Sequence, residues 1–330
     1  MKIFHIINQM HDIGGAELML CRLANRQFDC GYKVYVIVLR GESKLAYKKL
    51  NKGIKLFELK YGSSFSSIFA FLSVASLFNK YKPDVSQSWL YLSDFTNAFA
   101  SKISSFKPKI FWGIRNTKIP QGYFSLQGVL ILINSMISNL FNLNIICCSF
   151  ASKEFHEKLF FKKSRMKVIQ NGFDPNQYLF SQSKRNKKRQ ELRLKDNEVL
   201  IGNLCRFDKS KGLKDFVKTI SMLSRDKALR FIIQGRDIKN SSLLIKEIKK
   251  YGLENRVILS REDSDIQSFF SAIDIFYMSS HMEGFPNVLC EAMLHKRIVF
   301  STDVGDARRI LQSDDYIAPI SDSSIMASKI

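Results

Sequence analysis

Short apolar runs alternate with helical patterns along the whole of this 330-residue chain. In the first half the runs cover residues 3–7, 34–39, 55–59, 110–112 and 145–149. In the second half they cover residues 199–203, 230–234, 257–260, 273–277 and 298–301. Apolar strands that alternate with helices are typical of parallel sheets covered by helices on both faces. The pattern therefore predicts an α/β protein with two doubly wound parallel sheets.

The length and composition of the chain fit two globular domains. Hydrophobic residues make up 45% of the chain and charged residues 25%, which excludes a disordered protein. Asn171-Gly172 and the polar run 181–189 mark a junction near residue 175. We therefore predict an N-terminal domain at residues 1–174 and a C-terminal domain at residues 175–330.

The net charge of +21 belongs mainly to the first half of the chain. Residues 1–170 carry 24 lysines and arginines against 9 aspartates and glutamates, whereas residues 171–330 carry 27 against 21. A nucleic acid, an anionic membrane surface or a phosphorylated substrate could each explain the basic excess. Residues 158–167 mix cations with aromatic residues, which is typical of a membrane-surface or nucleic-acid patch, but a solvated helix end has the same composition.

The longest uncharged stretch covers residues 119–152 and contains an apolar segment at 128–141. Four asparagines interrupt it, at positions 134, 139, 142 and 144. Because a transmembrane helix is predominantly apolar over its whole length, we predict instead a buried or membrane-touching helix. A buried parallel strand is expected to follow it at 145–149.

Two features have the form of metal sites, but helix capping and thiol burial account for them better. Asp263-Ser264-Asp265 has the D-x-D spacing, yet it lies between the strand 257–260 and a predicted helix at 266–272, which is the place of a helix N-cap. The six cysteines form no C-x-x-C pair, and we predict buried, reduced thiols. We therefore expect no metal requirement and no other cofactor.

The most informative stretch is Glu283-Gly284-Phe285-Pro286-Asn287-Val288-Leu289-Cys290-Glu291-Ala292-Met293. Pro286 favours the first turn of a helix, and residues 287–293 have the pattern of its opening. The free N–H groups and the dipole of such a helix start form an anion site. Glu283 then lies on the loop before the helix and Glu291 about two turns into it, so the two carboxylates can reach different parts of one ligand.

Arg206 and Lys211 are a second pair of charges at a predicted helix start. They follow the strand 199–203 and flank the beginning of a helix at 213–223. Two fixed cations and a helix N-terminus can stabilise a departing diphosphate without a metal. The paired glycines Gly14-Gly15, in the loop after the strand 3–7, would let the backbone approach a diphosphate closely.

These segments resemble the motifs of glycosyltransferase family 4, whose members are retaining enzymes with the GT-B fold. The two glutamates are similar to the family's E-x7-E signature, and Arg206 to Gly212 is similar to its R-x4-K-G diphosphate clamp. Further similar segments follow the family's order: Ile13-Gly14-Gly15-Ala16-Glu17, Val168-Ile169-Gln170-Asn171-Gly172-Phe173-Asp174, Ile232-Ile233-Gln234-Gly235 and Thr302-Asp303-Val304-Gly305. The resemblance implies two Rossmann-like domains that face a cleft, with the acceptor bound by the first and a nucleotide-sugar donor by the second.

The resemblance also implies a role for each site residue. Glu283, Arg206 and Lys211 are the expected catalytic residues. Arg206 and Lys211 are expected to bind the donor diphosphate, and Glu283 to orient the donor sugar. Glu291 is expected to accept hydrogen bonds from the donor ribose. The other expected donor-binding residues are Gly14, Gly15, Gly235, Gly284, Phe285, Pro286 and Asn287.

The chain departs from the family's pattern in two places. Many members have a histidine in a segment similar to residues 87–94, where Leu90 or Leu92 stands here. Asp94 or Arg115 is then expected to do part of its work in acceptor binding. Because the sequence ends at Ile330, the family's usual C-terminal helices are expected to be short or missing.

By resemblance to the subgroup that builds O-antigen and capsule polysaccharides, we expect a retaining hexosyltransferase with a UDP-sugar donor. The expected acceptor is a saccharide on undecaprenyl diphosphate, at the cytoplasmic face of the bacterial inner membrane. The anionic membrane surface suits the basic first half. Nucleic-acid binding would explain the charge but not the motifs, so no nucleic acid is expected as a partner. A non-catalytic nucleotide-sugar-binding protein and a GT-B sugar-nucleotide epimerase remain as alternatives.

Overall fold

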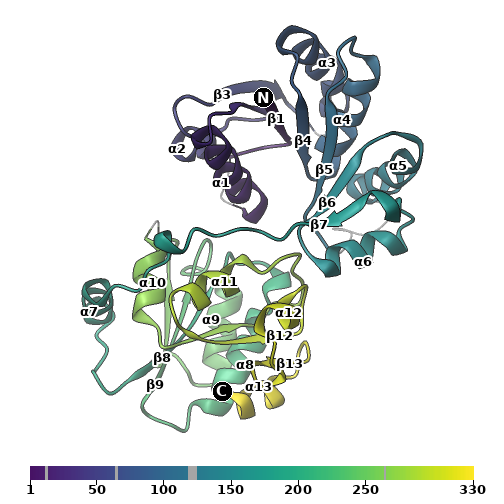
Figure 1. Cartoon of the computed structure of the whole chain (residues 1–330). Helices are drawn as coiled ribbons and strands as arrows, with labels where there is room; N and C mark the ends of the chain where they lie inside the picture. The colour runs from purple at the N-terminus through teal and green to yellow at the C-terminus, as the bar shows by residue number, and fades with distance from the viewer. Residues whose placement is uncertain (12–13, 64–65, 118–124, 264) are drawn as a thin grey trace. The chain divides into compact units, whose positions relative to one another are not determined.

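The computed structural model describes residues 1–330 except residues 12–13, 64–65, 118–124 and 264, and Figure 1 shows the course of the chain. The chain divides into two compact units, Met1–Asn171 (unit 1) and Gly172–Ile330 (unit 2). The predicted boundary between residues 174 and 175 falls within the first few residues of unit 2.

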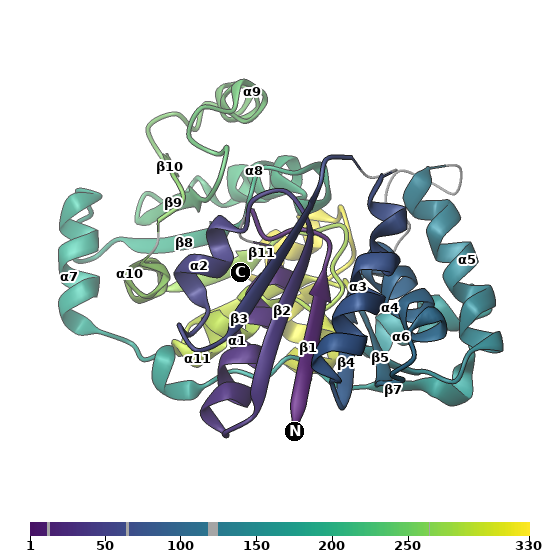
Figure 2. The ribbon, with the colours of Figure 1, turned by 90° about the horizontal axis from the view of Figure 1, so that it is seen from above.

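In the described part of unit 1, seven parallel strands form one sheet in the order β3-β2-β1-β4-β5-β6-β7. Figure 2 shows β1, β2 and β3 side by side. The strands are β1 (Lys2–Ile7), β2 (Lys33–Arg40), β3 (Lys55–Tyr61), β4 (Val85–Trp89), β5 (Lys109–Ile114), β6 (Asn144–Cys147) and β7 (Met166–Val168). The α-helices are α1 (Gly15–Asp29), α2 (Lys44–Lys49), α3 (Ala70–Tyr81), α4 (Tyr91–Ile103), α5 (Leu126–Leu140) and α6 (Phe150–Lys158).

In unit 2, the described residues form a six-stranded parallel sheet in the order β10-β9-β8-β11-β12-β13. The strands are β8 (Val199–Leu204), β9 (Leu229–Gln234), β10 (Val257–Ser260), β11 (Ile275–Met278), β12 (Ile298–Thr302) and β13 (Ile317–Ala318). The α-helices are α7 (Gln182–Glu191), α8 (Leu213–Leu223), α9 (Ser242–Lys250), α10 (Ile266–Ala272), α11 (Asn287–Leu294), α12 (Ala307–Leu311) and α13 (Ser323–Lys329).

Each sheet has a hydrophobic core on both faces, because successive strand residues point to opposite sides. In β2, Ile37 and Leu39 belong to the cluster around α3, α4 and α5, whereas Val36 and Val38 belong to the cluster around α1. Unit 2 repeats this arrangement in its two clusters. The predicted α/β class with two doubly wound parallel sheets is confirmed.

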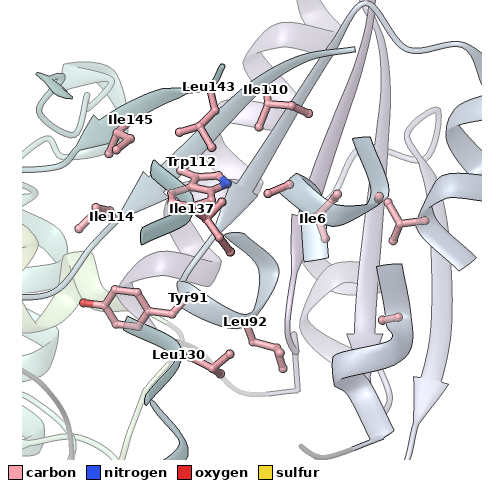
Figure 3. Close-up of a cluster of buried hydrophobic side chains, with 14 of the residues drawn as sticks. Ile6, Tyr91, Leu92, Ile110, Trp112, Ile114, Leu130, Ile137, Leu143 and Ile145 are labelled. Carbon is pink, nitrogen blue, oxygen red and sulfur yellow. The ribbon is translucent and has the colours of Figure 1, made fainter. Parts of the chain in front are cut away.

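Trp112 of β5 lies at the centre of the core between the sheet of unit 1 and helices α4 and α5. It is completely buried. Figure 3 shows side chains around it from α4, α5, β5 and β6, among them Leu92, Ile137 and Ile145. This packing fixes α4 and α5 against the part of the sheet that β5 and β6 form.

The strand β4 was not among the predicted strands, because its sequence Val-Ser-Gln-Ser-Trp lacks an apolar run. Its two serines are nevertheless buried and hydrogen bonded. Ser86 donates to Asn97 Oδ1 at 2.7 Å, and Ser88 donates to Asp94 Oδ1 at 2.6 Å. Both acceptors lie on α4, so hydrogen bonds replace the apolar contacts that usually join a helix to a central strand.

The predicted helix and strand in the uncharged stretch are confirmed as α5 and β6. Ser125 caps α5 by accepting a hydrogen bond from the backbone N–H of Gly128 at 3.0 Å. Within the described residues, no helix combines the length and the apolar character needed to cross a bilayer.

Strand order reverses direction once in each sheet. From β1 the chain continues to β2 and β3 on one side and then to β4 on the other. From β8 it continues to β9 and β10 on one side and then to β11 on the other. Open α/β sheets bind ligands at such switch points, beyond the carboxyl ends of the strands. The β1/β4 and β8/β11 switch points are therefore the first places to look for a site.

Candidate active site

Two loops at the β8/β11 switch point hold all three predicted catalytic residues. The first covers residues 205–212, between β8 and α8, and the second covers residues 279–286, between β11 and α11. Lys211 Nζ donates to Glu283 Oε1 at 2.7 Å, and Ser280 Oγ donates to the same oxygen at 2.7 Å. The structure therefore brings together Lys211 and Glu283, which lie 72 residues apart in the sequence.

The ion pair between Lys211 and Glu283 is largely buried, with 21% and 14% of the two side chains exposed. Burial lowers the pKa of Lys211, but the charge and hydrogen bond of Glu283 raise it more, so the net pKa lies above the usual value. Lys211 is thus a cation over the whole physiological pH range, and its charge is held at a fixed place.

Hydrogen bonds to backbone carbonyl groups join the two loops beside this pair. Ser279 Oγ donates to the Lys211 carbonyl at 2.9 Å, and the His281 N–H donates to the Ser210 carbonyl at 2.7 Å. Gly212 has a φ of +59°, and a Cβ there would lie 2.0 Å from the Ser279 carbonyl oxygen. Only glycine permits this approach.

Asp208 organises the first loop and lies beside Arg206. Its Oδ1 accepts hydrogen bonds from the Ser210 N–H at 2.8 Å and from Ser210 Oγ at 2.7 Å. Burial raises the pKa of Asp208, but the Ser210 hydrogen bonds and the charges of Arg206 and Lys211 lower it to a net value below the usual one. Arg206 is 3.4 Å from Asp208, and 58% of its side chain is exposed, so its guanidinium is accessible to an anion.

Two further glycines let neighbouring loops approach this site. Gly235, directly after β9, has a φ of +148°, and a Cβ there would lie 1.8 Å from the Cys205 carbonyl oxygen. Gly305, after β12, has a φ of +54°, and its Cβ would lie 2.8 Å from the Glu283 carbonyl oxygen. The structure thus places the predicted residue Gly235 against the first loop.

The helix α11 begins at Asn287, as predicted, with Pro286 at its N-cap position. Glu291 lies within it and is only 3% exposed. Tyr178 Oη donates to Glu291 Oε1 at 3.4 Å. The Glu291 side chain is therefore buried in unit 2 and is not a surface carboxylate. Gly284 and Phe285 directly follow Glu283 in the sequence and lead to the start of α11.

The remaining predicted residues lie in unit 1 at the β1/β4 switch point. Gly14 is the N-cap of α1 and Gly15 is its first residue, whereas the preceding Ile13 lies outside the described residues. Gly14 has an extended backbone with a φ of −118°, so its conformation does not require glycine. A Cβ at Gly14 would meet the Glu17 carboxylate, the mobile end of a side chain.

Asp94 and Arg115 are both held by protein neighbours. Asp94 is 1% exposed, and burial raises its pKa to about 7 in spite of the hydrogen bond from Ser88. Arg115 stacks on Trp89 with 4.3 Å between its guanidinium carbon and the ring centroid, and it donates to Asn171 Oδ1 at 2.5 Å. Asp94 of α4 therefore stabilises β4 through its hydrogen bond with Ser88. Arg115 is only partly buried.

The capping role predicted for Asp263-Ser264-Asp265 is confirmed at Asp265, while Ser264 lies outside the described residues. Asp265 Oδ1 accepts a hydrogen bond from the Ser268 N–H at 3.1 Å at the start of α10, and Lys184 donates to both of its oxygens at 2.9 Å. Asp263 Oδ1 accepts from the Asp265 N–H at 2.9 Å. Across the described residues, no three histidine, cysteine, aspartate or glutamate side chains gather as a metal-binding group.

All six cysteines are free thiols, as predicted, but only Cys21, Cys147 and Cys148 are fully buried; Cys205 and Cys290 are partly buried, and Cys30 is exposed. Sequence reasoning missed Ser280, Asp208 and His281, which hold the two loops in place. His281 Nε2 lies 2.6 Å from Asp215 Oδ2. Asp208 had a local signal, since Asp-x-Ser before a glycine is typical of a capped turn. Ser280 and His281 had none, because their partners are distant in the sequence.

Two family models match the chain and together cover nearly all of it. The model described as glycosyltransferase family 4 matches residues 13–177. The model described as glycosyl transferases group 1 matches residues 184–330. The first match is in unit 1 up to its last few residues, and the second is in unit 2 and includes both loops of the β8/β11 switch point.

Curated relatives and solved structures are similar to the chain at low identity. The O-antigen biosynthesis glycosyltransferase WclY of Escherichia coli is 29% identical over 133 residues, which span 40% of this chain but only 36% of that protein. The N,N'-diacetylbacillosaminyl-diphospho-undecaprenol alpha-1,3-N-acetylgalactosaminyltransferase of Campylobacter jejuni is 26% identical over 82% of this chain and 73% of its own length. The crystal structure of Anabaena HepE in complex with UDP matches 99% of this chain and 88% of its own, with 22% identity and a TM-score of 0.85. The chain therefore has the GT-B fold that the sequence predicted.

Proposed function

The chain belongs to glycosyltransferase family 4, and from this premise we propose that it transfers a sugar from a UDP-sugar to a saccharide on undecaprenyl diphosphate. The proposed pathway is the synthesis of a bacterial surface polysaccharide such as O-antigen or capsule. The observation that carries the proposal is the Lys211–Glu283 pair, which joins two charged loops at the β8/β11 switch point at 2.7 Å.

The donor diphosphate is proposed to bind Lys211 and Arg206. Lys211 offers a fixed, fully ionised ammonium group, and Arg206 offers a largely exposed guanidinium on the same loop. A cation that is already positioned stabilises the charge of the leaving diphosphate without reorganisation during the reaction. The proposal thus assigns the two cations to the bond-breaking step.

The rest of the donor is proposed to bind along the second loop and α11. Glu283 orients the donor sugar through its hydroxyl groups, and Glu291 accepts hydrogen bonds from the ribose. Gly235 and the run from Gly284 to Asn287 provide backbone close to the donor. HepE, whose fold the chain shares, has been crystallised with UDP-glucose, which supports a UDP-sugar as the donor.

The proposed reaction retains the configuration of the donor carbon. An acceptor hydroxyl attacks from the face that the diphosphate leaves, and the departing diphosphate takes the hydroxyl proton. Arg206, Lys211 and the N-terminus of α11 provide the positive charge that a divalent cation supplies in other transferases. The proposed enzyme therefore needs no metal.

The acceptor is proposed to bind unit 1, with Arg115 as a direct contact and Asp94 as its support, whereas Gly14 and Gly15 remain proposed donor-binding residues. The name of the Campylobacter jejuni relative contains diphospho-undecaprenol, which supports a polyprenyl-diphosphate acceptor. Such an acceptor lies in the bacterial inner membrane, so we place the working enzyme on the cytoplasmic face of that membrane. The basic excess of residues 1–170 suits its anionic surface.

The test is turnover of a panel of UDP-sugars with and without a saccharide on undecaprenyl diphosphate, followed by mass analysis of the products. The proposal expects a lipid product heavier by one sugar, formed only with acceptor. Release of free sugar without acceptor would instead identify an epimerase. Donor binding without turnover of any sugar would identify a non-catalytic nucleotide-sugar-binding protein.

A further inference from the structure

Helix α5 exposes an apolar stripe to the surroundings of unit 1. Figure 2 shows this helix on the outside of the unit. Met136 and Leu140 are 67% and 75% exposed, and the helix contains no charged residue. The spacing of the exposed apolar residues places them on one side of a helix. They are Val129, Leu132, Ile133, Met136 and Leu140.

The opposite side of α5 is buried and carries the polar Asn134, Ser135 and Ser138 beside apolar core side chains. Asn134 donates to the Tyr91 carbonyl at 2.8 Å, and Ser135 donates to the Leu159 carbonyl at 2.6 Å. Ser138 Oγ accepts a hydrogen bond from the Lys162 N–H at 3.1 Å. A helix of a water-soluble domain normally buries its apolar side and exposes its polar side. In α5 much of this arrangement is reversed, and specific hydrogen bonds hold the helix in that orientation.

Phe160 extends the apolar stripe. It is 82% exposed, the largest exposed fraction among the described large hydrophobic side chains. Its φ of +62° lies in the left-handed region, which is unfavourable for an aromatic residue. Asn139 of α5 donates to the Phe160 carbonyl at 2.9 Å, and the neighbours Leu159 and Lys162 are also hydrogen bonded to α5. The backbone at Phe160 is therefore fixed beside the helix, and its side chain is exposed to water.

Three lysines lie within three residues of Phe160 in the sequence. Lys158 and Lys163 are exposed, and Lys162 is partly exposed. An apolar stripe with an aromatic residue and adjacent lysines matches the chemistry of a bilayer interface with anionic headgroups. A second copy of the chain would bring a second set of the same cations to the contact, which is unfavourable.

We propose that α5 and Phe160 form a membrane-insertion surface that enters the headgroup and upper acyl region of an anionic bilayer. Lys158, Lys162 and Lys163 contact the lipid phosphates around it. The inference rests on the proposed function only in taking the acceptor to be lipid-linked. It adds that binding is partly apolar and therefore resists salt, whereas binding by charge alone is screened.

Vesicle co-sedimentation of the full chain, without donor or acceptor, tests the surface. The vesicles contain equal parts of phosphatidylethanolamine and phosphatidylglycerol. The double variant Met136→Asn, Leu140→Asn is expected to bind at least about tenfold more weakly, because two exposed apolar side chains no longer enter the bilayer. Phe160→Asn is expected to act in the same direction without backbone strain, because asparagine tolerates a positive φ.

The matched control is Met222→Asn with Leu243→Asn, two exposed residues of the same types on α8 and α9 in unit 2. It is expected to bind vesicles as the wild type does. A third variant replaces Lys158, Lys162, Lys163, Arg165 and Lys167 with glutamine. It is expected to bind weakly at low salt but to retain the salt-resistant part of binding, and its donor affinity is expected to be unchanged. Circular dichroism verifies that each variant is folded.

The inference is overturned if the α5 variants bind vesicles as tightly as the wild type, or if the control loses binding equally. It is also overturned if the wild type forms a dimer that the α5 variants abolish while vesicle binding stays the same. If the wild type transfers sugar to a detergent-dispersed acceptor but does not bind vesicles, the membrane-insertion surface is wrong and the proposed function stands. If the wild type binds vesicles through α5 but transfers no sugar, the proposed function is wrong and the membrane-insertion surface stands.

Discussion

The two switch points of the molecule have the same strand topology but differ in how much charge they hold. At β8/β11, Lys211 and Glu283 form an ion pair at 2.7 Å, and their loops are joined by side-chain and backbone hydrogen bonds. At β1/β4, the central groups are His5, Trp89 and Asp94, all nearly or fully buried. Trp89 Nε1 donates to His5 Nδ1 at 3.2 Å, and burial lowers the pKa of His5 to about 4.

The comparison suggests a division of labour between the two parallel sheets. A site that meets a diphosphate benefits from fixed charges at the loop ends, as in unit 2. The centre of the β1/β4 switch point carries less fixed charge, since His5 is uncharged at neutral pH and Asp94, with a pKa of about 7, is ionised only in part. Its ionic character comes from Arg115, which stacks over Trp89. The following predictions alter one side of this comparison at a time.

The largest effect is expected for Gly235→Ala in unit 2. Its Cβ would lie 1.8 Å from a backbone oxygen, and its φ of +148° is strained for any residue with a side chain. We expect a loss of at least about 4 kcal/mol of stability, measured by chemical denaturation. Gly252→Ala is the control, because Gly252 also has a positive φ but nothing within 4 Å. It is expected to cost only about 1–2 kcal/mol. Equal losses for both variants would contradict the close packing of Gly235 against Cys205.

The next effect concerns the pH dependence of stability in unit 1. The pKa of Asp94 is raised by burial from 3.8 to about 7. Between these values the folded protein keeps a proton that the unfolded chain has lost, so this group's contribution to stability falls as pH rises. The total over this range is about 4 kcal/mol, since one pKa unit corresponds to about 1.4 kcal/mol. Asp94→Asn removes this dependence.

The measurement for Asp94→Asn is the free energy of unfolding from pH 4 to pH 7. The stability of the variant relative to the wild type is expected to rise steadily across this range. His5 has the opposite slope, because its pKa is lowered from 6.5 to about 4, but it is present in both proteins and cancels in the difference. Parallel pH profiles for the two proteins would mean that Asp94 is ionised in the folded state.

A smaller effect on free energy is expected for the donor contacts in unit 2. Arg206→Ala and Glu291→Ala are each expected to weaken donor binding or turnover at least tenfold without unfolding the protein. The reason is the loss of charge-assisted hydrogen bonds, each worth about 1.5–3 kcal/mol. UDP titration by calorimetry and initial rates measure the effect.

Controls for the donor contacts follow from burial. Arg225→Ala replaces another exposed arginine of unit 2 and is expected to leave binding unchanged. Because Glu291 is buried, Glu291→Gln separates the loss of charge from the loss of packing. If UDP binds both alanine variants as it binds the wild type, the assignment of these residues to the donor site is wrong.

The sequence predicted the β8/β11 switch point better than the β1/β4 switch point, for a physical reason. Lys211 and Glu283 each lie in a short local pattern of turn, glycine and helix start, and such patterns can be recognised without knowing the fold. The strand β4 was missed because Ser86 and Ser88 are satisfied by partners on α4, which only the tertiary structure provides. Gln87, between them, is also buried.

Helix α5 shows the same limit of sequence-based prediction. Its existence followed from the apolar pattern, and its asparagines argued against a membrane span. Which side it exposes depends on Asn134 and Ser135, whose hydrogen-bond partners lie in α4 and after α6. Hydrophobic periodicity alone would have predicted the opposite orientation, with Met136 and Leu140 inside.

The smallest effect is expected for the removal of metal ions. Because Lys211 and Arg206 provide the positive charge at the switch point of unit 2, activity is expected to persist in EDTA. Asp263→Asn is expected to be nearly silent, since the retained amide oxygen can still accept the hydrogen bond from the Asp265 N–H, and the partner Lys188 is 3.6 Å away in a weak ion pair. Initial rates with EDTA, and with added Mg²⁺ or Mn²⁺, measure both expectations. If EDTA abolishes activity and Mn²⁺ restores it, while Asp263→Asn prevents the rescue, then Asp263 and Asp265 bind a metal and the two cations do not suffice for the departing diphosphate.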